Sequence, residues 1–250
     1  MLGTELSVLE LAGIVCVLLV GGFVRGYGGF GTSAVVITAL SPFISPSVLV
    51  PVMIMLEFVA SLIQARGAWP KIDWSILKVL VLGVAIGSPL GLMTHFFVSE
   101  QVVRMAILIF VLAISIALLM GWTLKRQPGT AGMVAVGTGS GVAATAASLG
   151  GLPIVLFMVA GDREPSVIRA TMVAFFLCTN LLALGLVASG GLLTSDSFLY
   201  AAVGIPVMAA GMWLGGRHFL GASASSFRRF VLSLLICLAL AGLARVAGLF

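Results

Sequence analysis

Residues 25–33 read RGYGGFGTS and interrupt an apolar tract that runs from LELAGIVCVLLVGGFV to AVVITALSPF. Glycines let a ligand approach the backbone closely, and we expect a short helix to start directly after them. The free N–H groups and the positive dipole end of that helix would point back into the break, where Thr32 and Ser33 could cap it. Arg25 would add a full positive charge. The stretch therefore predicts half of an anion-binding site.

A second glycine-rich break, SLGGLP at 148–153, precedes another short apolar segment. Gly150 and Gly151 leave the backbone accessible, and Pro153 suits the first turn of a helix. Broken helices persist in a membrane only where they are buried in protein or line a polar cavity. Paired breaks point to a transporter site near the midplane, so we expect the two breaks to face each other. The alternative is that the glycines serve close helix packing alone.

Glu57 lies in the middle of VPVMIMLEFVASLIQ, where an ionisable side chain is expensive and marks a functional site by default. It could carry a coupling proton, form a structural ion pair with Arg25, or lie closer to the membrane surface than predicted. Asn180 lies in the matching helix further along the chain and could contact the ligand or bond to another helix. Arg25 could also be a structural arginine near a helix end. Arg25 and Tyr27 of the first break, and Asn180, are also candidate substrate contacts.

The composition places these residues in a membrane protein. Of the 250 residues, 61 % are hydrophobic and 8 % are charged, and the mean hydropathy is +1.26. A soluble domain carries about a quarter charged residues, so the bilayer must be the solvent for this chain. The net charge of +5 is spread thinly between apolar segments, which argues against a nucleic-acid partner.

The sequence contains no arrangement of residues typical of an enzyme or a metal site. His95 and His218 are isolated, and Cys16, Cys178 and Cys237 lie inside apolar segments, where free cysteines behave as small hydrophobes. A serine hydrolase needs a serine, a base and an orienting acid brought together, and no such set is evident. We therefore expect no enzymatic activity, no cofactor and no metal.

Apolar segments long enough to span a bilayer, about 20 residues, alternate with shorter ones. We predict eight helices near full length at 8–24, 47–65, 75–93, 102–122, 130–147, 166–188, 197–215 and 227–248. Two short helices, 32–44 and 152–161, each follow a glycine-rich break. The predicted fold class is an all-α polytopic membrane protein with broken helices whose glycine-rich tips meet near the midplane.

The order of these segments repeats along the chain. At an offset of 119, SPSVLVPVMIMLEFVASLI (45–63) aligns with EPSVIRATMVAFFLCTNLL (164–182). The same offset places Gly31 on Gly150. A glycine break, a short helix and a Pro-Ser helix start therefore occur twice in the same order, as expected of an internal repeat.

We divide the chain into an N-terminal repeat, 1–124, and a C-terminal repeat, 125–250, within one membrane domain. Each repeat holds five segments, an odd number, so the second repeat should be inverted in the membrane. The positive-inside rule agrees with this arrangement and places both termini outside. Ten of the thirteen basic residues then fall on the cytoplasmic side: Arg66, Lys71, Lys78, Lys125, Arg126, Arg163, Arg169, Arg217, Arg228 and Arg229.

The sequence resembles the TauE/SafE family, the sulfite exporter or sulfonate permease group of membrane transporters. The resemblance lies in the early GYGGFGTS break, the Pro-Ser helix starts at 46 and 165, RATMVAFFLCTNLL, and the FRRFVLSLLICLALAGLAR ending, and it covers nearly the whole chain. It implies secondary transport of small anions, chiefly sulfite or sulfonates such as sulfoacetate, with export coupled to protons. Because the second break lacks the aromatic residue and extra glycine of the first, we do not count Ser148 and Leu149 among the contacts. The implied substrate contacts are Gly28, Gly29, Gly31, Thr32, Ser33, Gly150 and Gly151.

The leading hypothesis is a multi-pass transporter of the inner membrane that moves a small sulfur anion by alternating access. Its partners would be the anion, protons and the lipid bilayer, and a homo-oligomer is compatible with the sequence. Two alternatives remain, an anion channel and a membrane accessory subunit that transports nothing. Coupling to a proton gradient separates the transporter from the channel, and flux into liposomes separates both from the accessory subunit.

Overall fold

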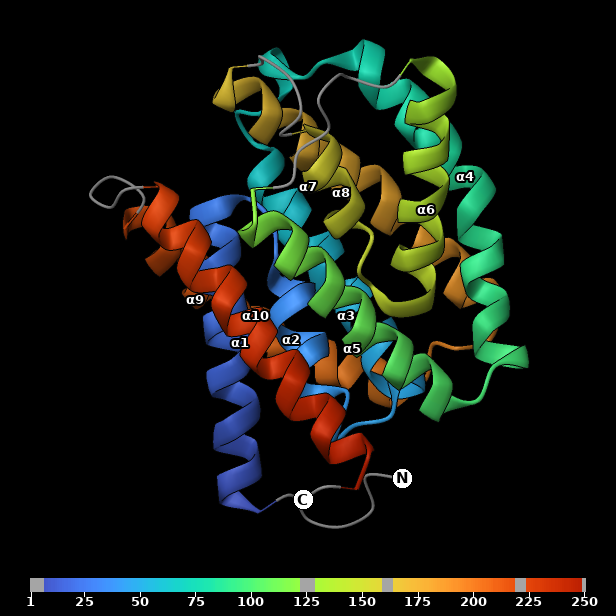
Figure 1. Cartoon of the computed structure of the whole chain (residues 1–250), viewed down its shortest axis with the longest axis vertical. Coiled ribbons are helices and arrows are strands. Elements are labelled where there is room, and N and C mark those ends of the chain that lie inside the picture. The colour runs from blue at the N-terminus through green and yellow to red at the C-terminus, as the bar shows by residue number, and fades with distance from the viewer. Residues whose placement is uncertain (1–6, 122–128, 159–163, 219–223, 249–250) are drawn as a thin grey trace.

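The computed structural model describes residues 7–121, 129–158, 164–218 and 224–248, and all regular structure in these residues is helical (Figure 1). The predicted all-α fold class is therefore confirmed, and each predicted segment corresponds to one helix. The short 3-10 helix η1 was not predicted. Lys125, Arg126 and Arg163, and the boundary between the two predicted repeats, lie outside the described residues.

The helices of the first half are α1 (Val8–Gly28), α2 (Thr32–Leu40), α3 (Pro46–Ala65), η1 (Trp69–Lys71), α4 (Trp74–Phe97) and α5 (Glu100–Leu119). Those of the second half are α6 (Thr130–Ala147), α7 (Gly151–Met158), α8 (Pro165–Ser189), α9 (Ser195–His218) and α10 (Ala224–Val246).

Local capping signals explain where several helices begin. Ser7 and Glu10 form a reciprocal capping box at the start of α1, with the Ser7 hydroxyl accepting from the Glu10 N–H at 3.3 Å. Ser45 caps α3, and Pro46 occupies its first turn, where a missing N–H costs nothing. Asp73 caps α4 by accepting from two backbone N–H groups.

Seven helices are long and apolar enough to cross a membrane: α1, α3, α4, α5 and most of α8, α9 and α10. Large apolar side chains are exposed along their outer faces, for example Leu82, Ile86 and Leu90 of α4. In a bilayer these faces meet lipid rather than water. The eighth predicted full-length helix, α6, has 18 residues rich in glycine, alanine and threonine, and it is not among the seven.

Glycines bring two pairs of helices into backbone contact. A Cβ on Gly83, Gly87 or Gly91 of α4 would overlap a backbone carbonyl oxygen of α6, and Gly137 and Gly141 of α6 face α4 in the same way. Small residues at such interfaces allow close packing in a bilayer, where dispersion rather than the hydrophobic effect drives helix association. The composition of α6 is therefore explained by its packing on α4.

The second backbone contact joins α1 to α9. A Cβ on Gly22 or Gly26 would overlap the carbonyl oxygen of Met208 or Met212, respectively. Gly211 and Gly215 of α9 approach α1 equally closely. From the sequence, close helix packing was considered as a role for the glycines of the two breaks. The structure shows such packing between these long helices, for which it was not predicted.

The two halves are interleaved around a buried centre. The first α-helix of each half packs on the fourth α-helix of the other half, so α1 packs on α9 and α6 packs on α4. In addition, α3 packs on α8, and α5 packs on α10. Helices α3 and α8 are the most buried of the candidate spans. Helix α1 begins near the end of the molecule where α10 ends, whereas α6 begins at the opposite end (Figure 1). This reciprocal pairing is the pattern that two inverted repeats would produce, and the inversion itself stays a prediction.

Candidate functional site

Two short breaks occupy equivalent positions in the two halves. Only residues 29–31 are non-helical between α1 and α2, and only residues 148–150 between α6 and α7, so the breaks differ by the predicted offset of 119. The first break is shorter than predicted, because α1 continues to Gly28 and ends where the Gly29 N–H donates to the Arg25 carbonyl at 2.6 Å. Arg25 and Tyr27 therefore lie in the last turns of α1 and not in the break.

Left-handed backbone conformations end the helices at both breaks. Gly29 has φ = 80° and Gly31 has φ = 104°, values that glycine adopts without steric cost. Ser148 ends α6 with φ = 56° and ψ = 25°, and it is the only non-glycine residue with positive φ in the described part of the chain. A side chain in this region is strained by roughly 1–2 kcal/mol. Such strain is common at functional sites.

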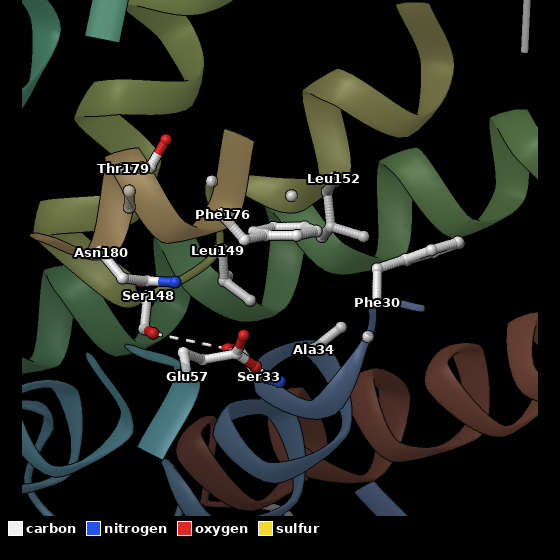
Figure 2. Close-up of a pocket in the computed structure, with 14 residues that line it drawn as sticks. Phe30, Ser33, Ala34, Glu57, Ser148, Leu149, Leu152, Phe176, Thr179 and Asn180 are labelled. Atoms are coloured by element: carbon white, nitrogen blue, oxygen red, sulfur yellow. Dashed lines mark hydrogen bonds between the residues drawn. The ribbon is translucent and has the colours of Figure 1, made fainter. Parts of the chain in front are cut away.

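The two breaks face each other across the centre of the protein. The hydroxyl oxygens of Ser33 and Ser148 lie 3.4 Å apart, although 115 positions separate them in the chain (Figure 2). A cavity of about 30 Å³ lies beside this contact. A water molecule needs about 10–15 Å³, so the cavity has room for about two waters. Its lining is formed by Phe30, Gly31, Ser33, Ala34, Glu57, Ala144, Ser148, Leu149, Gly150, Gly151, Leu152, Phe176, Thr179 and Asn180.

The N-terminus of α2 binds an anion, and that anion is the carboxylate of Glu57. Its Oε1 accepts from the Ser33 backbone N–H at 3.1 Å and from the Ser33 hydroxyl at 2.7 Å. Its other oxygen, Oε2, pairs with Arg25. Helix α2 therefore offers the donors that the sequence predicts. In this conformation the protein itself uses one of them.

Arg25 is held by side chains of α3. Its Nη1 bonds to Glu57, its Nη2 donates to the Ser61 hydroxyl at 2.8 Å, and its Nε donates to Gln64 Oε1 at 3.1 Å. Arg25 is fully buried and Glu57 is 3 % exposed. The depth of Glu57 in the membrane stays a prediction. The predicted Arg25–Glu57 ion pair is present, and each partner has further hydrogen bonds, as a buried pair requires.

The second half contributes polar atoms that have no protein partner. Asn180 is 5 % exposed and Thr179 is 2 % exposed, and the Asn180 Nδ2 and Thr179 Oγ1 atoms accept or donate no hydrogen bond among the described residues. In Figure 2 the Asn180 amide nitrogen points toward the interior of the pocket, whereas the Thr179 hydroxyl points away from the Ser33–Ser148 contact. A buried donor without a partner is costly, and a ligand could satisfy it.

The predicted site residues fall into two groups. Six of them line the cavity: Gly31, Ser33, Glu57, Gly150, Gly151 and Asn180. The others, Arg25, Tyr27, Gly28, Gly29 and Thr32, do not line it. Arg25 lies behind Glu57, with its guanidinium carbon 5.2 Å from the centre of the Phe176 ring. Whether any of these residues contacts the substrate stays a prediction.

Several residues of the cavity were not predicted from the sequence. Ser148 and Leu149 were not counted as contacts, yet both line it, as do Phe30 and Phe176. The offset of 119 could have indicated two of the missed positions, because it places Phe176 on Glu57 and Ala144 on Arg25. The first half thus carries the ion pair where the second half carries two apolar residues, and Glu57, Ala144 and Phe176 all line the cavity.

Comparison with known proteins agrees with the membrane architecture. No curated protein and no solved structure matches the chain significantly. The family model described as "Sulfite exporter TauE/SafE" matches residues 14–242, which is nearly the whole chain. That family consists of transporters, in agreement with the expectation that the chain is not an enzyme. The chain belongs to the TauE/SafE sulfite exporter family and is a multi-pass membrane transporter of small anions.

Proposed function

We propose that the protein exports sulfite or a small organosulfonate such as sulfoacetate across the inner membrane by alternating access. The observation that carries the proposal is the cavity between the two breaks, where the unpartnered Asn180 amide lies beside the Ser33 and Ser148 hydroxyls. Sulfite and sulfonates present several oxygen acceptors on one sulfur. Donors that come from both halves of the chain suit such a group.

The cavity between the breaks is small in this conformation. Room for about two waters is too little for a sulfonate that keeps its own substituent. Binding therefore requires the halves to separate or Glu57 to leave the N-terminus of α2. The proposed repeats, 1–124 and 125–250, would rock against each other along α3 and α8, which pack together at the centre.

Glu57 supplies a route for proton coupling. Its carboxylate holds the Ser33 donors and the Arg25 guanidinium, which are the donors an incoming anion would use. Two anions in one buried site repel each other, and protonation of one removes the repulsion. Anion and proton would therefore bind together and leave together. Export would then run down the outward gradient of the anion and carry a proton with it.

Ligand binding and flux on purified protein test this function. Sulfite, sulfate, thiosulfate, sulfoacetate, taurine and acetate would be compared by thermal shift, because a ligand that binds only the folded state must stabilise it. Proteoliposomes loaded with the stabilising anion and a pH-sensitive dye would then report efflux. The expected result is efflux accompanied by alkalinisation of the lumen.

Three other results would contradict the proposal in different ways. If efflux causes no pH change but builds up a membrane potential that opposes further anion efflux, the protein is an anion channel. Binding without flux leaves a receptor or accessory role. If no anion shifts the melting curve and the liposomes stay tight, the protein is a non-transporting subunit and the breaks serve packing.

A further inference from the structure

A second and larger cavity, about 310 Å³ in volume, lies where the end of α3 meets η1 and the first turns of α8. We call it the basic vestibule. Among the described residues that line it, none is acidic, and three are basic. Its polar lining consists of Gln64, Arg66, Lys71, Ser166 and Arg169. By the positive-inside rule, these cations place the vestibule at the cytoplasmic face.

The basic vestibule is connected to the central cavity by a chain of polar contacts. Gln64 lines the vestibule, and its Oε1 accepts from Arg25 Nε at 3.1 Å. Arg25 in turn pairs with Glu57, which lines the central cavity. Arg169 also reaches the first break, because its Nη2 donates to the Gly26 carbonyl at 3.4 Å and its side chain packs against Gly29. The side chains of Gln64, Arg25 and Glu57 thus link the vestibule to the Ser33 donors.

A cavity of similar size lies at the opposite end of α3 and α8, and it has the opposite charge. Its volume is about 320 Å³, and Ser47 lines it at the position that the offset of 119 equates with Ser166. Its only charged lining residue in the described part of the chain is Asp196. Each of the two serines also donates to a glutamate, Ser166 to Glu164 at 2.5 Å and Ser47 to Glu100 at 2.6 Å. Because both cavities have such a glutamate beside the serine, these acids do not account for the difference in charge between the two cavities.

We propose that the basic vestibule is an electrostatic capture site for the oxyanion substrate at the cytoplasmic mouth, an inference that rests on the proposed anion export. Arg66, Lys71 and Arg169 hold the sulfonate or sulfite group before it passes Gln64 toward the central cavity. The opposite mouth has no lining cation among the described residues and carries Asp196, so an anion delivered there is released without being retained.

The charge difference acts on kinetics and not on the direction of net flux. A cavity lined by one sign of charge concentrates the oppositely charged ligand and speeds its association, and this effect weakens as salt is added. The apparent KM for the anion should therefore be lower at the cytoplasmic face than at the opposite face. The equilibrium across the membrane still depends only on the gradients.

A cysteine in the basic vestibule tests the proposal without requiring transport. Ser166→Cys would be placed in a chain whose Cys16, Cys178 and Cys237 are replaced by alanine. Its modification rate, divided by the rate of a free thiol in solution with the same reagent, would be compared for two methanethiosulfonate reagents of similar size, one with a sulfonate and one with a quaternary ammonium group. The sulfonate reagent should react roughly tenfold faster, because one-signed clefts raise the local concentration of counter-ions by that order.

Charge-removing variants identify the origin of that preference. The double variant Arg66→Gln, Lys71→Gln removes two positive charges and should abolish most of this preference. The control Lys78→Gln removes one positive charge from the nearby surface of α4 and should leave the preference unchanged. Sulfoacetate should protect the cysteine from both reagents. Equal rates for both reagents, or an equal effect of the Lys78 variant, would overturn the proposal.

The cysteine modification is repeated in vesicles of phosphatidylcholine with and without phosphatidylglycerol. This decides whether the basic vestibule binds a free oxyanion or the headgroup of an anionic lipid. If phosphatidylglycerol protects the cysteine and sulfoacetate does not, the basic vestibule binds a lipid headgroup and the capture proposal is wrong. In sided proteoliposomes, the double variant should raise the cytoplasmic KM several-fold. A wild type that transports no anion but keeps the charge-selective, sulfoacetate-sensitive reaction would refute the proposed function while supporting the capture site.

Discussion

Glu57 occupies the N-terminus of α2 through Ser33: its Oε1 lies 3.1 Å from the Ser33 backbone nitrogen and 2.7 Å from the Ser33 hydroxyl. The same hydroxyl lies 3.4 Å from the hydroxyl of Ser148 in the second break. One buried acid therefore connects α3 to both breaks. Its protonation or displacement would change contacts in both halves of the chain at once.

Removing the charge of Arg25 alone should destabilise the protein severely. Arg25→Met leaves the Glu57 carboxylate buried without its cation, at a cost of about 3–5 kcal/mol. The double variant Arg25→Met, Glu57→Met removes both charges and should recover most of this loss. Unfolding in detergent micelles measures both. A double variant no more stable than Arg25→Met would show that the charge left unpaired is not what destabilises the single variant.

Glu57→Gln should make anion binding independent of pH. In the wild type, affinity for a sulfonate whose own charge does not titrate should rise as pH falls, because a protonated Glu57 no longer competes for Arg25 and Ser33. Glutamine imitates that neutral form, so the variant should bind at all pH values at least as tightly as the wild type does in acid. Calorimetric titration across pH checks this, and an unchanged pH dependence in the variant would exclude Glu57 as the coupling group.

Asn180→Leu should weaken anion binding without loss of stability. The Asn180 Nδ2 has no hydrogen-bond partner among the described residues, so the loss of this donor breaks no hydrogen bond within the described part of the protein. A lost hydrogen bond to a charged ligand costs about 1.5–3 kcal/mol, which is roughly tenfold or more in affinity. Thr179→Val is the matched control, because that hydroxyl points away from the Ser33–Ser148 contact (Figure 2). Equal losses in both variants would place the anion elsewhere.

Ser148→Gly should be more stable than Ser148→Ala. Both variants lose the hydroxyl contact with Ser33. Only glycine relieves the left-handed backbone strain at φ = 56°, so it should be the more stable of the two by about 1 kcal/mol. Thermal melts of the three proteins in one detergent make the comparison. A melting temperature for the glycine variant at or below that of alanine would contradict the strain argument.

Gly87→Ala should disrupt the packing of α4 on α6. The new Cβ would overlap the Thr138 carbonyl oxygen, and overpacking of a tight interface costs about 1–3 kcal/mol. Gly139→Ala, on the facing helix α6, is the control, because a Cβ there has no heavy atom within 4 Å. The control should be neutral or slightly stabilising, since alanine favours helix over glycine. Similar melting temperatures for both variants would show that the helices do not pack this closely.

Much of the architecture follows from the sequence because its signals are local. The composition leaves only the bilayer as solvent, and serine, aspartate and proline caps set where α1, α3 and α4 begin. The repeated order of a glycine break and a Pro-Ser helix start predicts two equivalent breaks, and they occur 119 positions apart. A break needs only a residue that can leave the helix and a helix that starts after it, so neighbours in sequence suffice to predict it.

Only the tertiary structure decided which groups meet at the breaks. The sequence left Glu57 as a proton carrier, an ion-pair partner or a surface residue, and the fold placed it on both Arg25 and Ser33. Ser148 was set aside because its break looked less complete, yet its hydroxyl is the one that reaches Ser33. These contacts join residues from different helices, and their distances depend on how closely glycines allow α1 to approach α9 and α6 to approach α4. That approach is set by backbone packing between distant segments, and no local pattern encodes it.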